Sequence, residues 1–146
     1  MNDQALESMD LMGQMPGSLA HIEGRVITEM SCLGANLLYV YEPPCDVLGN
    51  DPGLVMDART LFWDFPGLSQ TFFRRSQALA MFLPVRWILR TEPLGVWLHT
   101  TIPKVSTEAT ADRVTDPILR KLAEKVQTAY GRVCMEPRPT TRVQPV

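Results

Sequence analysis

The strongest constraint on the fold is a segment with the pattern of a two-faced hairpin. In residues 85–90, Val85, Trp87 and Leu89 share one face and the two arginines lie on the other, which is typical of a strand with one buried face. Residues 92–95 have Pro at the second and Gly at the fourth position, as a type I turn prefers, and residues 96–102 alternate again. We therefore predict an antiparallel hairpin with one apolar side. The other side is predicted to carry Arg86, Arg90, Trp97, His99 and Thr101.

A well-marked helix is predicted over residues 116–130. Asp116 is suited to accept a hydrogen bond from the first turn, and Pro117 takes the first helical position, where a backbone N–H has no partner. Apolar residues then recur at spacings of three and four, which places them on one face. We expect Gly131 to end this helix in the left-handed conformation.

Five further segments carry weaker signals. The apolar runs 36–41 and 54–65 predict strands, and we expect the first to be well buried. The segment 22–30 predicts another strand, because valine, isoleucine and threonine occur together there. Helical spacing predicts a helix over 69–83 that ends before a proline. Residues 132–136 predict a last short strand.

Both ends of the chain have the character of arms. Leu6, Met9 and Met12 recur at a spacing of three, which indicates a short amphipathic helix within residues 1–17. This helix either caps the protein's own core or docks into a groove of a partner. Residues 137–146 contain three prolines and no helical periodicity, so we expect an extended Pro-rich arm.

This order of elements predicts an α+β fold. We expect a mainly antiparallel sheet of four to five strands with helices packed on one side. The chain has 146 residues, which is enough for one hydrophobic core. We therefore assign residues 1–136 to a single domain.

Charge is divided unevenly along the chain. The first 64 residues contain ten acidic and two basic side chains, and the remaining 82 contain six acidic and twelve basic ones. The formal charges of −8 and +6 combine to the net −2. If these segments form opposite faces, the unlike faces of two molecules attract one another. We therefore expect association with further copies of the chain or with a charged partner.

Residues able to support catalysis or to bind a metal are dispersed. The three cysteines and two histidines match no zinc spacing, and no Gly-rich phosphate loop is present. Cys45 lies in an acidic segment, which disfavours the thiolate that a nucleophile requires. We expect no catalytic residue, no metal and no cofactor. His99 and Trp97 form the one candidate ligand site.

The leading functional hypothesis is a non-enzymatic assembly subunit of a ring or tube, for example in a phage neck or tail. Its partners are expected to be copies of itself or other protein subunits, in the cytoplasm or in a virion assembled there. The longest apolar run, 78–85, is too short to cross a bilayer, so we expect no membrane association. The predicted interface residues are Leu6, Met9, Met12, Arg74, Arg75, Arg86, Arg90, Arg138 and Arg142.

Three alternatives stand beside this hypothesis. The protein is a chaperone or adaptor for one partner, or a small ligand-binding or enzymatic domain centred on His99, or a binder of single-stranded nucleic acid. The last function would use basic side chains beside aromatic ones, although the net charge of −2 disfavours it. Its candidate residues are Arg74, Arg75, Arg86 and Arg90.

Overall fold

The fold is α+β, as the order of elements predicted. A computed structural model describes residues 7–43, 57–75, 82–104 and 116–135. Along the chain the elements are β1 (Ser8–Met15), α1 (Leu19–Cys32), β2 (Asn36–Tyr41), β3 (Ala58–Asp64), α2 (Pro66–Arg75), β4 (Val85–Glu92), β5 (Gly95–Pro103) and α3 (Asp116–Cys134).

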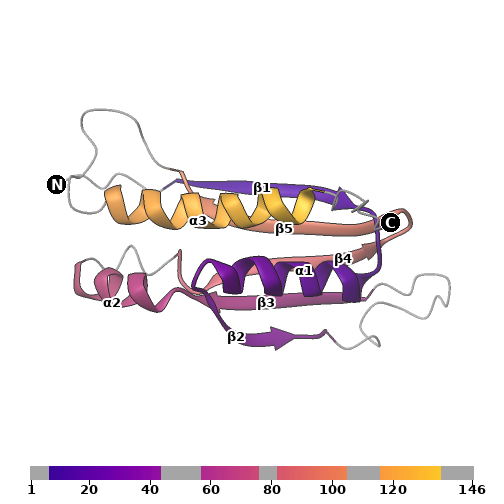
Figure 1. The fold of residues 1–146 in the computed structure, drawn as a ribbon, viewed down its shortest axis with the longest axis horizontal. Coiled ribbons are helices and arrows are strands. Elements are labelled where there is room, and N and C mark those ends of the chain that lie inside the picture. Colours follow the sequence, from indigo (N-terminus) through magenta and orange to yellow (C-terminus); the bar gives the residue numbers. More distant parts are fainter. Residues whose placement is uncertain (1–6, 44–56, 76–81, 105–115, 136–146) are drawn as a thin grey trace, which may run out of the picture.

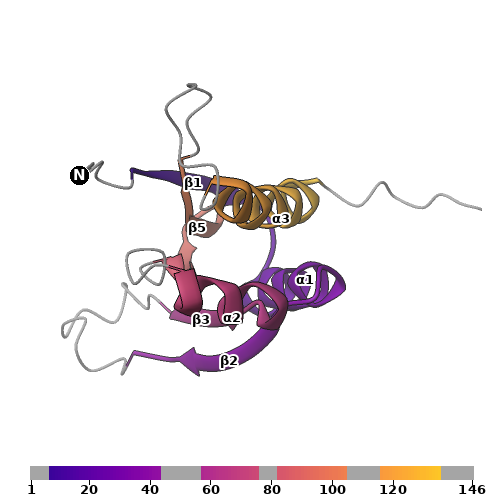
Figure 2. The same ribbon diagram turned by 90° about the vertical axis from the view of Figure 1, so that its left-hand side faces the viewer.

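The strands form one five-stranded sheet in the order β1-β5-β4-β3-β2, and every neighbouring pair is antiparallel. Helices α1 and α3 lie side by side over the same face of this sheet, and α2 lies near one end (Figure 1). Strands β1 and β2 occupy opposite edges (Figure 2). Within the described residues, no helix covers the second face of the sheet.

The predicted hairpin is confirmed and forms the centre of the sheet. Glu92 pairs with Gly95 across the turn, and the two strands stay in register from there. Trp87 and Leu98 point toward the helices and are fully buried. Gly95 has a φ of +146°, and a Cβ atom there would lie 2.1 Å from the carbonyl oxygen of Met15. Glycine is therefore required where the end of β1 meets the hairpin.

The core lies between the sheet and the two long helices. Helix α1 buries Ile22, Val26 and Met30, which recur every fourth residue. Helix α3 buries Leu122 and Val126 on its own sheet-facing side. Such residues drive the packing, because each fully buried aliphatic side chain contributes about 1.5–3 kcal/mol before entropy is counted.

The strand predicted over residues 22–30 is wrong, because this segment lies within α1. The Ser18 side chain accepts a hydrogen bond from the His21 N–H and caps the first turn. At the other end, Gly34 takes a φ of +88° and Ala35 N–H donates to the Met30 carbonyl, which is the arrangement of a Schellman motif. Both caps and the fourfold spacing outweigh the β-branched residues in the segment.

The helix predicted within residues 1–17 is also wrong, since residues 8–15 form strand β1. Strand periodicity places Leu11 and Met15 on the helix-covered face, where both pack against the core. The spacing of three between Met9 and Met12 therefore puts these two side chains on opposite faces. Tertiary pairing with β5 decides the conformation. Leu6 lies outside the described residues.

Two helices, α2 and α3, differ in their bounds from those predicted. Helix α3 continues to Cys134, so Gly131 does not end it and the strand predicted over 132–136 is wrong at these positions. Val133 is fully buried, and its packing explains the extra turn. Helix α2 is described over Pro66–Arg75, whereas residues 76–81 of the predicted helix lie outside the described residues. The predicted arm 137–146 also lies outside them.

Candidate interaction surface

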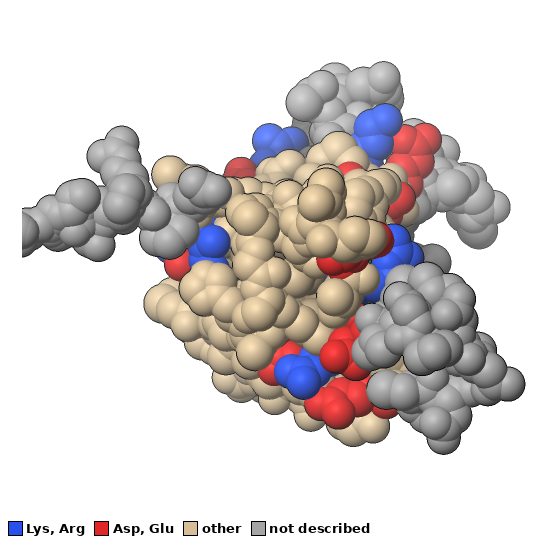
Figure 3. Space-filling model, turned by 90° about the vertical axis from the view of Figure 1, so that its right-hand side faces the viewer, with Lys and Arg blue, Asp and Glu red and all other residues tan. Residues whose placement is uncertain are grey.

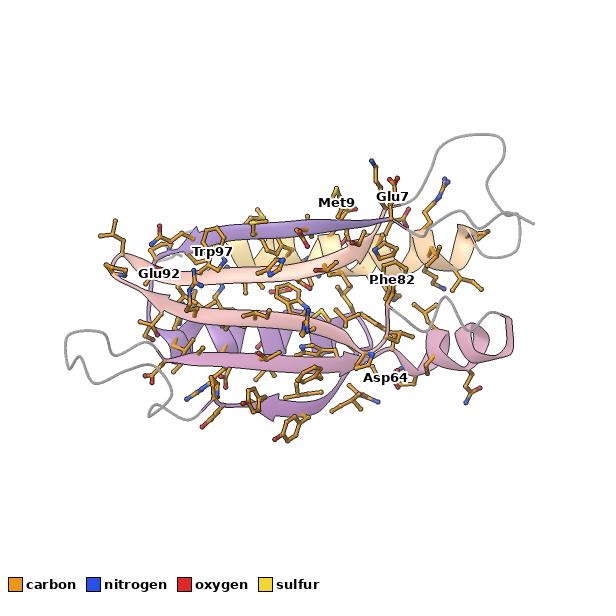
Figure 4. The ribbon with its side chains drawn as sticks, turned by 180° about the vertical axis from the view of Figure 1, so that it is seen from behind. Glu7, Met9, Asp64, Phe82, Glu92 and Trp97 are labelled. Carbon is orange, nitrogen blue, oxygen red and sulfur yellow. The ribbon has the colours of Figure 1, made fainter. Side chains whose placement is uncertain are left out.

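The side of the sheet opposite the helices, here called the open face, combines aromatic, aliphatic and charged side chains (Figure 4). Register places Phe62 of β3 directly opposite Arg86 of β4. It likewise places Arg90 of β4 opposite Trp97 of β5. Ile88 lies between the two arginines on the central strand. The open face thus has aliphatic and aromatic groups at its centre with guanidinium groups interleaved.

Strand β2 continues this surface to the edge of the sheet. Its Leu38, Tyr39 and Tyr41 side chains are 58%, 59% and 46% exposed. The prediction that this apolar strand is well buried is therefore wrong. β2 lies beyond β3 at the edge, and a register shift between Leu37 and Tyr39 interrupts its pairing. A bulge of this kind redirects side chains locally.

The exposed tyrosines of β2 are the functional candidates that sequence reasoning missed. Tyr39 and Tyr41 are spaced by two, so both lie on the side of the sheet that carries Phe62. The Tyr39 ring packs at a tilt against Phe62, with 6.3 Å between the ring centroids. Their signal in the sequence was present: residues 36–41 contain no charge at all. Strand order, which sequence periodicity does not reveal, decides that this strand is exposed.

His99, the candidate ligand residue, belongs to a hydrogen-bonded group on the open face. Asp10 Oδ1 lies 3.1 Å from His99 Nε2 and accepts a hydrogen bond of 3.0 Å from Thr101 Oγ1. The His99 contact, followed by the Thr101 hydroxyl, holds the pKa of Asp10 below its usual value of 3.8. This group connects β1 to β5 across an exposed surface. Trp97 shares the face with His99 but pairs with Gln14 and Arg90.

Acidic and basic side chains are intermixed on the folded protein. Lys104 of the second half pairs with Glu7 of the first at 3.4 Å, and Arg132 pairs with Glu29 at 3.8 Å. Red and blue side chains lie next to one another at several places in Figure 3. The uneven charge along the chain therefore does not become two separate faces in the described residues, because β1 lies beside β5 and α1 beside α3.

The predicted interface residues do not form one cluster. Arg86 and Arg90 lie on the open face, and Met12 joins them there through its pairing with His99. Met9 pairs with Ile102 and so lies on the helix-covered side. Arg74 and Arg75 end α2, at one end of the sheet. Leu6, Arg138 and Arg142 lie outside the described residues.

The described part of the chain contains two cysteines, which lie on different helices. Cys32 is exposed on α1 and Cys134 is half-buried at the end of α3. Burial raises the pKa of the Cys134 thiol, which disfavours the thiolate. Among residues 7–43, 57–75, 82–104 and 116–135, no three His, Cys, Asp or Glu side chains lie together as a metal site would require. Cys45 lies outside these ranges.

The comparison with known proteins concerns the fold. No family model and no curated protein matches the sequence. Among solved structures, the chain is similar to an uncharacterized conserved protein, DUF302, from Bacillus stearothermophilus, with 13% identity and a TM-score of 0.60. The match covers 86% of this chain and 94% of that chain. At this identity the likeness supports the α+β fold and transfers no function.

None of the helices in the described part of the chain is both long enough and apolar enough to cross a membrane.

Proposed function

We propose that this protein is a non-enzymatic assembly subunit that binds other protein subunits, copies of itself included, through the open face and β2. The observation that carries the proposal is a sheet with helices on one side only (Figure 2) and with exposed apolar side chains on the open face and on its edge strand β2. Exposed large apolar side chains of this kind on a small domain favour an interaction site.

The composition of the surface supports a protein partner. Aromatic residues and arginine are enriched at protein interfaces, whereas lysine and glutamate are depleted. The open face presents Phe62 and Trp97 opposite Arg86 and Arg90. Ile88, at the centre of the sheet, is suited to become the buried middle of such a contact.

The mixing of charges changes the physical basis expected for association. Among the described residues, attraction between a positive and a negative pole is not available, because ion pairs within the molecule already join the two halves. Burial of apolar surface takes its place as the driving force. Since salt screens exposed charges but does not weaken apolar burial, we expect association to depend little on ionic strength.

The test is the oligomeric state of an open-face variant. We expect the wild-type chain to associate in sedimentation velocity, and Ile88→Lys to raise the association midpoint about tenfold or more, because a lysine resists burial at an interface. Leu94→Lys is the matched control, since Leu94 is 81% exposed in the β4–β5 turn, away from the open face. A wild-type chain that stays monomeric over a wide concentration range contradicts the proposal. So does an Ile88→Lys variant that associates like the control.

Binding of single-stranded nucleic acid is the second candidate. It is favoured by the two arginine–aromatic pairs on the open face, since bases stack on aromatic rings while arginines contact phosphates. It is opposed by two acidic groups: Glu92 accepts two hydrogen bonds from Arg90, and Asp10 lies near His99. An oligonucleotide retained at low salt and released as salt rises would favour this candidate.

A further inference from the structure

We infer that two copies of this chain pair antiparallel along β2, so that their sheets become continuous across a twofold axis. The inference rests on the proposed function and names the partner for one part of the interaction surface. It concerns the outer edge of β2, which has no strand partner among the described residues, since β2 pairs with β3 alone.

The composition of β2 is unusual for a sheet edge. Natural edge strands are commonly protected from further pairing by charges, prolines or short length. Residues 36–41 contain neither a charge nor a proline, and they include two leucines and two tyrosines. Apart from the bulge between Leu37 and Tyr39, the strand therefore lacks the features that prevent addition of another strand.

The side chains of β2 are exposed on both sides of the sheet. Tyr39 and Tyr41 lie on the open face, in register with Phe62 and Thr60, whereas Leu37 is in register with the buried Trp63. Both Leu37 and the tyrosines remain more than a third exposed. A strand added at the edge places side chains next to both sets at once. A helix or loop laid on one face would cover only one set.

The area available is appropriate for part of a dimer interface. The exposed fractions of Tyr39 and Tyr41, 59% and 46%, correspond to about 200 Å² per copy for two rings of ordinary size. Leu37 and Leu38 add further apolar surface, and both copies contribute equally. With the backbone hydrogen bonds of the new ladder, the contact supplies part of the roughly 1,200 Å² that specific interfaces bury in total.

A second copy is the occupant that fits β2, because an antiparallel pair of identical strands is its own complement. Glu42, which follows the strand, lies 3.5 Å from Arg59 of the same molecule, so its charge is already offset within each copy.

Pairing along β2 would also enlarge the surface proposed for partner binding. The open faces of the two copies would lie side by side, with Tyr39 and Tyr41 of each at the seam. Because the sheet already twists strongly toward β2 (Figure 2), the joined sheets form a curved surface.

The experiment combines one substitution with one measurement on the unmodified chain. Leu38 is 58% exposed and has no register partner in β3, so Leu38→Lys leaves the monomer's ladder intact. We expect Leu38→Lys to raise the dissociation constant at least about tenfold relative to Leu94→Lys, because each dimer loses two buried leucines. In the wild-type chain, hydrogen exchange of the β2 amides is expected to slow as concentration rises, while exchange of the β1 amides stays constant.

The outcomes separate this inference from the proposed function. Slower exchange in β2 together with weaker association of Leu38→Lys supports the inference. If the wild-type chain associates, but Leu38→Lys associates like Leu94→Lys and β2 exchange does not change, pairing along β2 is wrong and the proposed assembly role stands. A wild-type chain that remains monomeric overturns both.

Discussion

The two edge strands of the sheet, β1 and β2, differ in how far their outer edges are protected from pairing with another strand. β1 has eight residues in continuous register with β5, and its Asp10 side chain contacts His99 and Thr101 of that strand. Glu7, just before β1, accepts a backbone hydrogen bond from Lys104 and pairs with its ammonium group. β2 has six residues, an interrupted register and no charge.

This difference shows how an edge can be closed or left available. On β1, the carboxylates of Asp10 and Glu7 contact partners within the molecule. They also add negative charge where another strand would approach, which discourages pairing between molecules. The residues of β2 itself carry no charge, although Glu42 just after the strand pairs with Arg59. The exposed side chains of β2 are those that stabilise sheets when a neighbour is present. The described residues therefore close the β1 edge through internal contacts and leave β2 with exposed apolar side chains.

The largest loss of stability is expected from a substitution of Gly95, where the end of β1 meets the hairpin. Gly95→Ala places a Cβ atom 2.1 Å from the Met15 carbonyl oxygen and requires a side chain at a φ of +146°. Because the close contact is with backbone, relief requires the strand end to move. We expect a loss of about 2–4 kcal/mol in the free energy of unfolding, measured by urea denaturation. A loss below about 0.5 kcal/mol would show that the end of β1 is not fixed as described.

A smaller loss of stability is expected from a substitution of Gly34, the glycine just before β2. Gly34 also has a positive φ, +88°, but an added Cβ atom would meet nothing within 4 Å. Gly34→Ala should therefore cost only the conformational penalty, about 1 kcal/mol. The same denaturation measurement compares the two variants. Equal losses for Gly34→Ala and Gly95→Ala would mean that steric contact at β1 contributes nothing beyond φ.

The sequence predicted well those elements whose local pattern agrees with their tertiary role. Alternation in the 85–102 hairpin gave both the strands and the faces of Trp87 and His99 correctly. Strand 36–41 was placed at its observed bounds, but its exposure was not foreseen. The apolar content of a strand indicates that its side chains favour burial against another surface. It does not indicate whether that surface belongs to the same molecule.

The errors arose where two periodicities were both present in a short segment. Residues 8–15 contain methionines at a spacing of three, yet Leu11 and Met15 reach the core as members of a strand. Residues 22–30 contain β-branched residues, yet Ile22, Val26 and Met30 form a helical stripe. In both segments, long-range packing decides between the alternatives. The same packing places β1 beside β5 and removes the charge asymmetry seen along the chain.

The smallest change in stability is expected from a substitution of Asp10. The direction of its pH dependence follows from the lowered pKa of this carboxyl group. The contacts with His99 and Thr101 favour the charged form of Asp10 in the folded state, so folding is stabilised while Asp10 is ionised. This contribution is present above the usual pKa of 3.8 and is lost as pH falls through the lower pKa of the folded state. Thermal unfolding of wild type and Asp10→Asn should thus differ at neutral pH and converge in acid.

A difference in unfolding temperature that persists unchanged in strong acid would mean that the charge of Asp10 does not hold β1 to β5. The closure of that edge would then depend on backbone pairing with β5, on the Glu7–Lys104 ion pair and on the close approach of Gly95 to Met15. In that case the contrast between the edges would rest on length and register: eight continuous pairs for β1 and an interrupted ladder for β2. Addition of a strand at β2 would still be favoured, because the exposed apolar side chains there do not depend on Asp10.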